Sequence, residues 1–196
     1  MYEQETFEKT LELAQKAYDN DELPVGAILK VFEHSSNNNK LIFEYCAHNQ
    51  TNKNKDPLSH CEKICIEKYI ESREEYINKS NIIVDMDTGK EYEKLINNGD
   101  NNLTNTENNL KNDILEIYIT LEPCVMCYGI IERLSKYVKH IYVYYGVKNE
   151  IFGATTVLKD IISNTNDKIT FKDINDYRTV EIIKKFYSEN RNERVN

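Results

Sequence analysis

The chain has 196 residues, of which 40% are hydrophobic, and a formal net charge of −8. This length and composition fit one folded domain over residues 1–196 with a proper core. No stretch approaches the length that crosses a bilayer, and the acidic N-terminus lacks the apolar run of a signal peptide. We therefore expect a cytoplasmic or nuclear protein that is neither secreted nor membrane-bound.

The first half of the chain predicts a helix, a strand hairpin and a second helix. Phe7, Leu11 and Ala14 recur at helical spacing. The apolar run that follows indicates a strand buried on both faces, and a polar turn returns the chain as a second strand. Asp56-Pro57 marks a loop before the next helix. The expected bounds are about 5–20 for the first helix, about 24–31 and 41–47 for the strands, and a start near Ser59 for the second helix.

The second half predicts a strand, a helix and a strand in close succession, and then an amphipathic helix. This succession indicates a right-handed parallel crossover, so we expect a mixed sheet between layers of helices. Residues 97–112 are half Asn, which predicts a mobile, low-complexity surface insertion within a less defined region at about 79–112. A short polar tail is expected at about 189–196. The expected bounds are about 116–121, 124–136 and 140–145, and the closing helix carries Val180, Ile183, Phe186 and Tyr187.

Two short motifs carry the chemistry of the chain. One residue separates His60 from Glu62, and Pro123 precedes a pair of cysteines, Cys124 and Cys127, that are separated by two residues. Two thiolates from the first turn of a helix and one imidazole would leave the fourth position of a zinc ion open for water, and helix N-termini favour thiolates. This pair of motifs is the known signature of the zinc nucleobase deaminases. We therefore predict a catalytic Zn²⁺ held by the histidine and both cysteines, with Glu62 as the catalytic residue.

Each motif taken alone has a simpler interpretation. Ser59 and Glu62 match a capping box, in which the Glu only satisfies backbone donors. The Cys-x-x-Cys pair is also compatible with a redox pair or, with Cys61 or Cys65 as fourth ligand, with a structural zinc site. Cys61 and Cys65 instead share an apolar helix stripe with Ile64, as small core thiols do. The joint presence of the motifs favours the catalytic zinc site.

Further blocks in the same order extend the match. Residues 22–27 read Glu-Leu-Pro-Val-Gly-Ala, Asn49 lies eleven residues before His60, and residues 120–127 and 145–153 surround or follow the cysteine motif. With these blocks the chain strongly resembles the tRNA adenosine deaminases of the cytidine deaminase-like superfamily. Its Asn-Glu-x-Phe-Gly segment is more similar to the catalytic subunit of the eukaryotic heterodimeric enzyme than to the bacterial homodimer.

The resemblance implies an α/β fold of three α/β/α layers with a mixed five-stranded sheet. It also implies deamination of adenosine to inosine at the wobble position of tRNA anticodons, position 34. Glu62 then acts in turn as base and acid: it takes a proton from the attacking water, protonates N1 of the adenine and finally protonates the departing amine. The substrate-binding residues that the resemblance implies are Pro24, Val25, Asn49, Glu122 and Asn149.

The acidity of the chain bears on its partners. Phosphate binding normally needs a basic surface, and a net charge of −8 is unfavourable for holding a tRNA. The resemblance implies a heterodimer with a paralogous non-catalytic subunit, and a homodimer when the chain is expressed alone. Two rival functions stay open: a deaminase of free nucleobases or nucleotides (cytosine, guanine or deoxycytidylate), and a non-catalytic partner subunit. The tRNA contacts expected in the C-terminal stretch are Lys184, Lys185, Arg191 and Arg194.

Overall fold

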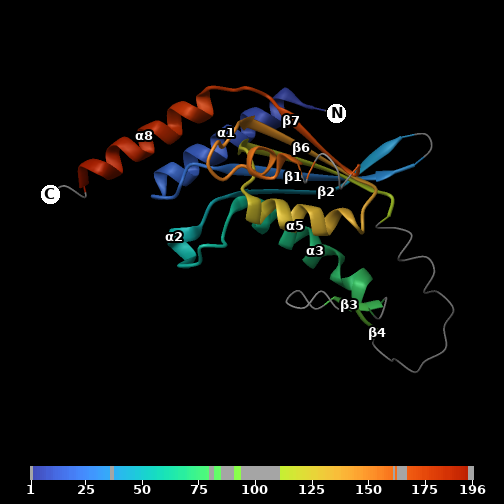
Figure 1. Cartoon of the computed structure of the whole chain (residues 1–196). Helices are drawn as coiled ribbons and strands as arrows, with labels where there is room; N and C mark the ends of the chain where they lie inside the picture. Colours follow the sequence, from blue (N-terminus) through green and yellow to red (C-terminus); the bar gives the residue numbers. More distant parts are fainter. Residues whose placement is uncertain are drawn as a thin grey trace.

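Five strands form one sheet at the centre of the chain, shown as a computed structural model in Figure 1. The strands are β1 (Gly26–His34), β2 (Asn39–His48), β5 (Asp113–Leu121), β6 (His140–Val147) and β7 (Ile169–Asp173). Their order across the sheet is β2-β1-β5-β6-β7. β1 lies antiparallel to β2 and β5, whereas β5, β6 and β7 run parallel, so the sheet is mixed as predicted. The structure describes residues 2–35, 38–79, 82–84, 91–93, 111–160, 162 and 167–193.

Helices cover both faces of the sheet, which confirms the predicted three layers (Figure 1). On one face, α1 (Gln4–Asp19) and α8 (Arg178–Glu193) pack on each other; on the other face lie α3 (Cys61–Lys79) and α5 (Val125–Ser135). The connection through α5 joins the parallel strands β5 and β6, as predicted. The structure also contains two short helices, α2 (Thr51–Asn54) and α6 (Ala154–Val157), and a separate antiparallel pair, β3 (Ile82–Val84) and β4 (Glu91–Glu93).

The covered faces explain why β1 is a continuous apolar run. Successive side chains of a strand point to opposite faces of the sheet. Ala27 and Leu29 belong to the core beneath α3 and α5, whereas Ile28 belongs to the core beneath α1. Each fully buried Ile or Leu side chain contributes about 1.5–3 kcal/mol to folding. Because neither face meets water here, β1 has no need of alternating polar residues.

Several element bounds differ from the predicted ones. β1 begins at Gly26 rather than at Pro24, because the backbone N–H of Val25 bonds to the carbonyl of Leu23 at 2.7 Å in a tight turn before strand pairing starts. β7 was not predicted from residue patterning, since it is a five-residue edge strand without a fully buried residue. α8 continues to Glu193, into the segment expected to be a polar tail.

Most of the expected insertion lies outside the described residues. Within 79–112 the structure describes the end of α3, the two short strands β3 and β4, and residues 111–112. Asn112 belongs with the sheet, because its carbonyl accepts a hydrogen bond from the backbone N–H of His34 at 3.1 Å. Across the described part of the chain, no helix has the length and hydrophobicity needed to cross a membrane.

Candidate zinc site

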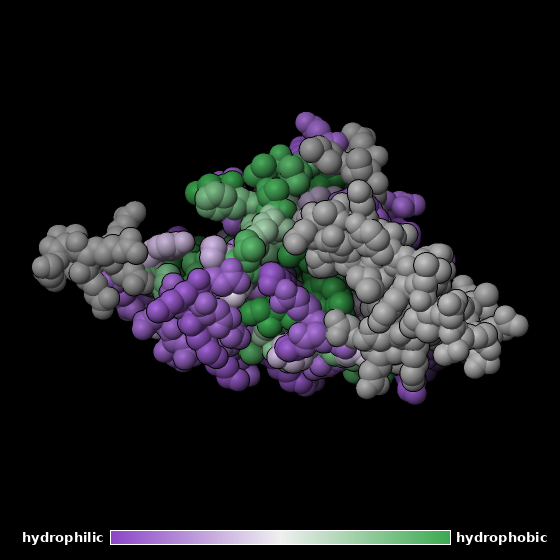
Figure 2. Space-filling model, turned by 90° about the horizontal axis from the view of Figure 1, so that it is seen from below, coloured by the Kyte–Doolittle hydropathy of each residue, from purple (hydrophilic) through white to green (hydrophobic). Residues whose placement is uncertain are grey.

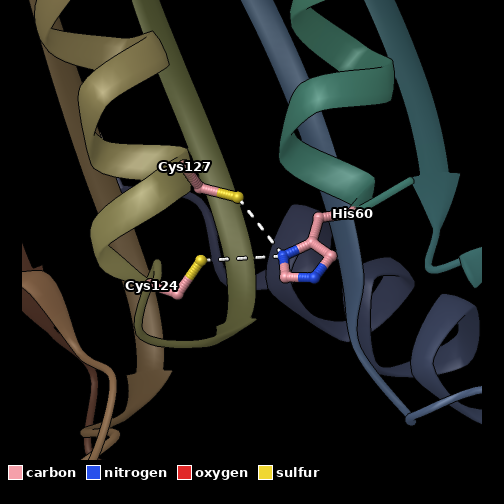
Figure 3. A group of neighbouring side chains, drawn as sticks. All are labelled: His60, Cys124 and Cys127. Carbon is pink, nitrogen blue, oxygen red and sulfur yellow. Dashed lines mark hydrogen bonds between the residues drawn. The ribbon is translucent and has the colours of Figure 1, made fainter. Parts of the chain in front are cut away.

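The N-termini of two helices meet at the C-terminal ends of β2 and β5 and bring the predicted metal ligands together (Figure 3). His60 immediately precedes α3, Cys124 immediately precedes α5, and Cys127 lies in the first turn of α5. β2 and β5 are both antiparallel to β1, so they run in the same direction and their C-terminal ends lie on the same side of the sheet. The loops that follow these two strands therefore bring the imidazole and the thiols together, although His60 and Cys124 are 64 positions apart in the sequence.

The distances between the three side chains fit a tetrahedral zinc ion. The Nδ1 atom of His60 lies 3.7 Å from the Sγ of Cys124 and 3.5 Å from the Sγ of Cys127, and all three ligand atoms lie within 4.8 Å of one another. Tetrahedral coordination with ordinary Zn–S and Zn–N bond lengths sets nitrogen and sulfur about 3.6 Å apart. One nitrogen and two sulfur donors are also a common donor set for catalytic zinc.

The thiols are electrostatically suited to bind a cation. A hydrogen bond from Cys127, reinforced by one from His60, lowers the pKa of the Cys124 thiol to about 4. The same pairing with Cys124, together with burial, raises the pKa of Cys127. A bound dication favours the thiolate form of both sulfurs.

The other buried cysteines lie outside this group. Cys65 is directed at the sheet, with its Sγ 3.8 Å from the carbonyl oxygen of Ala27 and 3.7 Å from that of Tyr45. The thiol of Cys61 donates to the carboxylate of Glu62, with Sγ and Oε2 3.2 Å apart. Among the described residues, neither belongs to the group of potential ligands, which leaves one coordination position open for water.

Glu62 lies beside the three donors and is only 4% exposed. Burial raises the pKa of its carboxyl group, and the neighbouring His60 opposes this shift. The capping-box interpretation is wrong: α3 begins at Cys61, so Ser59 is not its capping residue. The Ser59 hydroxyl instead donates to the carboxylate of Asp56 at 3.0 Å. Glu62 is thus a buried carboxyl group in the first turn of α3 that does not form a capping box with Ser59.

A cavity of about 400 Å³ opens beside the three donors. Its polar lining includes His60 and Glu62, and much of the remaining wall is apolar, which is typical of a small-molecule or nucleobase pocket. Val25 lines the cavity as expected, whereas Pro24 is buried and does not line it. The other three predicted substrate-binding residues that line it are Asn49, Glu122 and Asn149.

Asn49 joins the strand hairpin to the N-terminus of α3. Its backbone N–H donates to the carbonyl of Val25 at 3.0 Å, and its side-chain oxygen accepts from the backbone N–H of Cys61 at 3.0 Å. The side-chain oxygen therefore satisfies a free N–H at the start of the helix. Within the described residues its amide nitrogen donates no hydrogen bond, so that group is available to a ligand in the cavity.

Glu122 organises the loop between β6 and α6 and is only 2% exposed. Its carboxylate accepts hydrogen bonds from the backbone N–H of Asn149 at 2.9 Å, and from the backbone N–H and hydroxyl of Thr155 at 2.7 and 2.6 Å. The loop wraps so tightly that a Cβ on Gly153 would lie 2.2 Å from the carboxylate. Sequence reasoning missed Thr155 and Gly153, whose roles depend on this contact.

A second buried carboxylate, Glu22, holds the loop on the other side of the cavity. It accepts from the hydroxyl of Thr51 at 2.9 Å and from the backbone N–H groups of Asn52 and Lys53 at 3.0 and 2.8 Å. These bonds fix α2, which lies between Asn49 and the zinc-site helix. Sequence reasoning missed this role as well, because Glu22 follows the polar residues Asp19, Asn20 and Asp21 and so resembles an ordinary surface carboxylate.

The predicted tRNA contacts are only partly described. Lys184 and Lys185 are exposed on α8, which lies across the sheet from α3 and α5. The ammonium of Lys185 lies over the ring of Tyr18, 4.6 Å from its centroid. The side chain of Arg191 and the whole of Arg194 lie outside the described residues.

A mixed sheet with two helix N-termini holding these donors defines the class of zinc-dependent deaminases. Residues 1–145 match the family described as "Cytidine and deoxycytidylate deaminase zinc-binding region". The chain belongs to this family, which confirms the predicted fold class and zinc chemistry.

Individual proteins similar to this chain are more specific than the family. Over 92% of its length the chain is 29% identical to tRNA-specific adenosine deaminase 2 of Xenopus tropicalis, covering 86% of that protein. It is 26% identical, over the same share, to the protein of that name from Danio rerio, of which 68% is covered. A solved structure from a study of A-to-I editing by tRNA:A34 deaminases matches 92% of this chain and 99% of its own. Its TM-score is 0.55 at 20% sequence identity, so this likeness supports the fold.

Proposed function

We propose that the protein is a zinc-dependent deaminase that hydrolyses adenosine to inosine, with release of ammonia, at position 34 of tRNA anticodons. The observation that carries the proposal is the group of three zinc donors beside the buried Glu62, in a cavity of nucleobase size. The two relatives above are named as tRNA-specific adenosine deaminases and align with 92% of the chain, which supports tRNA as the substrate.

The residues of the cavity divide the reaction between them. His60, Cys124 and Cys127 would hold the zinc ion, which lowers the pKa of a bound water and so provides a nucleophile at neutral pH. Glu62 takes one proton from the attacking water and donates it to N1 of the adenine. It then takes the remaining proton from the hydroxyl group now on C6 and donates it to the amine, so that the carbonyl of inosine forms as ammonia leaves. Its raised pKa suits this alternation, since the carboxyl group must both accept and release protons.

The substrate base has polar contacts available on both sides of the cavity. The free amide nitrogen of Asn49 faces no protein acceptor among the described residues, so it is the donor that the first loop offers to the substrate. Glu122 and Asn149 act mainly by shaping the second loop, because their oxygens already accept hydrogen bonds within it. Val25 contributes apolar wall, next to the buried Pro24.

We also propose that the whole chain, residues 1–196, forms one deaminase domain that works in the cytoplasm or nucleus as a heterodimer. The partner is a paralogous, non-catalytic subunit that adds basic surface, because a chain of net charge −8 has little attraction for tRNA. The chain forms a homodimer when expressed alone. Glu62 and a complete set of zinc donors favour the catalytic role over the non-catalytic one.

Single-turnover deamination tests this function. The zinc-loaded chain is incubated, alone and with the co-expressed partner, with a tRNA that carries adenosine at position 34, and inosine is measured by sequencing. We expect editing that is fast with the partner and slow without it. Cytosine, guanine and deoxycytidylate are tested in parallel. Release of ammonia from one of these, without inosine in the tRNA, would establish the free-nucleobase function instead.

A further inference from the structure

The mouth of the cavity carries two large hydrophobic side chains that project into solvent. Ile151 is 74% exposed and Phe152 is 63% exposed, and both line the cavity that contains Glu62. Figure 2 shows the molecule from the side of α3 and α5, where hydrophobic residues gather next to hydrophilic ones. Exposure of an aromatic ring to water is unfavourable, and a ring at the opening of a binding cavity favours a ligand that covers it.

The turn that presents these side chains is held firmly in place. The side-chain oxygen of Asn149 accepts hydrogen bonds from the backbone N–H groups of Ile151 and Phe152 at 3.3 and 3.1 Å. The backbone N–H of Gly153 donates to the carbonyl of Asn149 at 2.8 Å, and the carbonyl of Phe152 accepts from the N–H of Val125 at 3.0 Å. The turn is therefore tied to the start of α5, beside the zinc donors, and ring and reactive centre are fixed relative to each other.

A nucleic-acid substrate that enters this cavity loses base stacking at its mouth. A cavity of about 400 Å³ admits one nucleoside, so the target must leave the base stack and its two neighbours must stay at the mouth. Those neighbours lose a stacking partner when the target base leaves. Proteins that bind single-stranded RNA replace such contacts with aromatic rings.

We propose that Phe152 is a stacking platform for the nucleotide next to the target adenosine, with Ile151 packing against the edge of the same nucleotide. This inference rests on the proposed function, and it names a substrate-contacting residue outside the catalytic group. The two exposed charged residues of the turn, Lys148 and Glu150, have opposite signs, so the turn itself adds no net attraction for phosphate. The platform therefore acts through the ring, and its contribution is independent of salt, unlike that of phosphate contacts.

Binding of an anticodon stem-loop RNA to the zinc-loaded full chain, with its partner, measures the contribution of the ring. We expect Phe152→Ala to weaken binding about 5- to 150-fold, the range found when single base–aromatic stacks are removed. The factor should be the same at low and high salt. Phe152→Tyr keeps the ring and should stay close to wild type. Tyr177→Ala is the matched control, because Tyr177 is 67% exposed but does not line the cavity.

The absence of tryptophan from the chain allows a direct observation. Phe152→Trp introduces the only tryptophan of this chain at the mouth, and we expect RNA binding to quench its fluorescence relative to a wild-type complex measured in parallel. An RNA without the bases at positions 33 and 35 should bind more weakly and quench less. Equal quenching by both RNAs, or wild-type affinity of Phe152→Ala, would overturn the inference.

Two further outcomes separate this inference from its alternatives. If Phe152→Ala changes the subunit stoichiometry in light scattering and leaves RNA affinity unchanged, the ring belongs to a subunit interface and the platform is wrong. If wild-type protein with its partner neither binds nor edits the RNA, the proposed function itself fails. Editing that is insensitive to Phe152 removes only the stacking platform.

Discussion

The two loops that flank the cavity are held by the same kind of hydrogen-bonded carboxylate but present different surfaces. Each wraps around a buried carboxylate that accepts three hydrogen bonds, Glu22 for the loop with α2 and Glu122 for the loop after β6. The first loop leads into His60 and Glu62, and its short helix is polar. The second presents the exposed hydrophobic residues Ile151 and Phe152. The comparison teaches that one loop aligns the chemistry, whereas the other prepares the contact with the substrate.

The largest effect is expected at the metal donors where the two loops meet. Cys124→Ala removes one of three ligands, so we expect loss of zinc and of all deamination. Cys61→Ala and Cys65→Ala are matched controls, because both thiols are buried and neither belongs to the donor group: the thiol of Cys61 donates to Glu62, and that of Cys65 is directed at the sheet. Metal analysis of purified protein should give one zinc per chain for wild type and both controls. Loss of zinc in either control would show a fourth protein ligand.

Glu62→Gln tests whether Glu62, which follows the first loop, is a catalytic residue or only a buried carboxyl group. We expect turnover to fall by at least about 10²–10⁴-fold, the usual contribution of general acid–base catalysis, while zinc content and the unfolding transition stay unchanged. Single-turnover rates and metal analysis of the same preparation are the measurements. Activity within tenfold of wild type would leave Glu62 without its catalytic role.

Glu22→Gln and Glu122→Gln compare the two loops directly. In each variant an amide NH₂ can face a backbone donor, and an unmade buried hydrogen bond costs about 1–3 kcal/mol. We expect both to lower the free energy of unfolding, measured with urea, but only Glu122→Gln to weaken RNA binding in addition, because it loosens the turn with Phe152. Glu150→Gln, an exposed change in the same turn, is the control. Equal RNA affinity of the two buried variants would mean that the loops do not differ in function.

The stabilising effect of Glu22 should depend on pH in a defined direction. Burial raises the pKa of Glu22, but the hydrogen bonds from Lys53 and Asn52 outweigh it, so the pKa is lowered in the folded chain. Stability from a carboxyl group with a lowered pKa is present above its unfolded value of about 4.3 and is lost as the pH falls through the folded value. The difference in unfolding free energy between wild type and Glu22→Gln should therefore shrink below about pH 4. A difference that grows on acidification would contradict this.

The smallest effect is expected in the Asn-rich segment. Deletion of residues 97–110 should leave zinc content and editing rate unchanged, because the segment has little apolar surface to bury and long loops add little closure entropy. Residues 111–112 are kept, since Asn112 bonds to His34 beside the sheet. Loss of folding or of tRNA binding in the deletion would show that the segment carries a structural element.

The sequence alone determined the chemistry of the site, because that chemistry depends on residue type and short spacing. The donor set, the acid–base residue and the apolar strands were all readable from local patterns, since metal ligation and strand burial leave local signatures. The edge strand β7 left no such signature, because its residues are only half buried.

Only the tertiary structure decided how these parts meet. β2 and β5 run in the same direction, so both motifs lie at the same end of the sheet. Because α3 starts at Cys61, Glu62 does not form the capping box with Ser59. Glu122 was expected to contact substrate, yet its oxygens are occupied by a loop more than 25 residues away in sequence. Such partners are fixed by pairing across the fold, and no local pattern specifies which buried carboxylate will meet which backbone N–H.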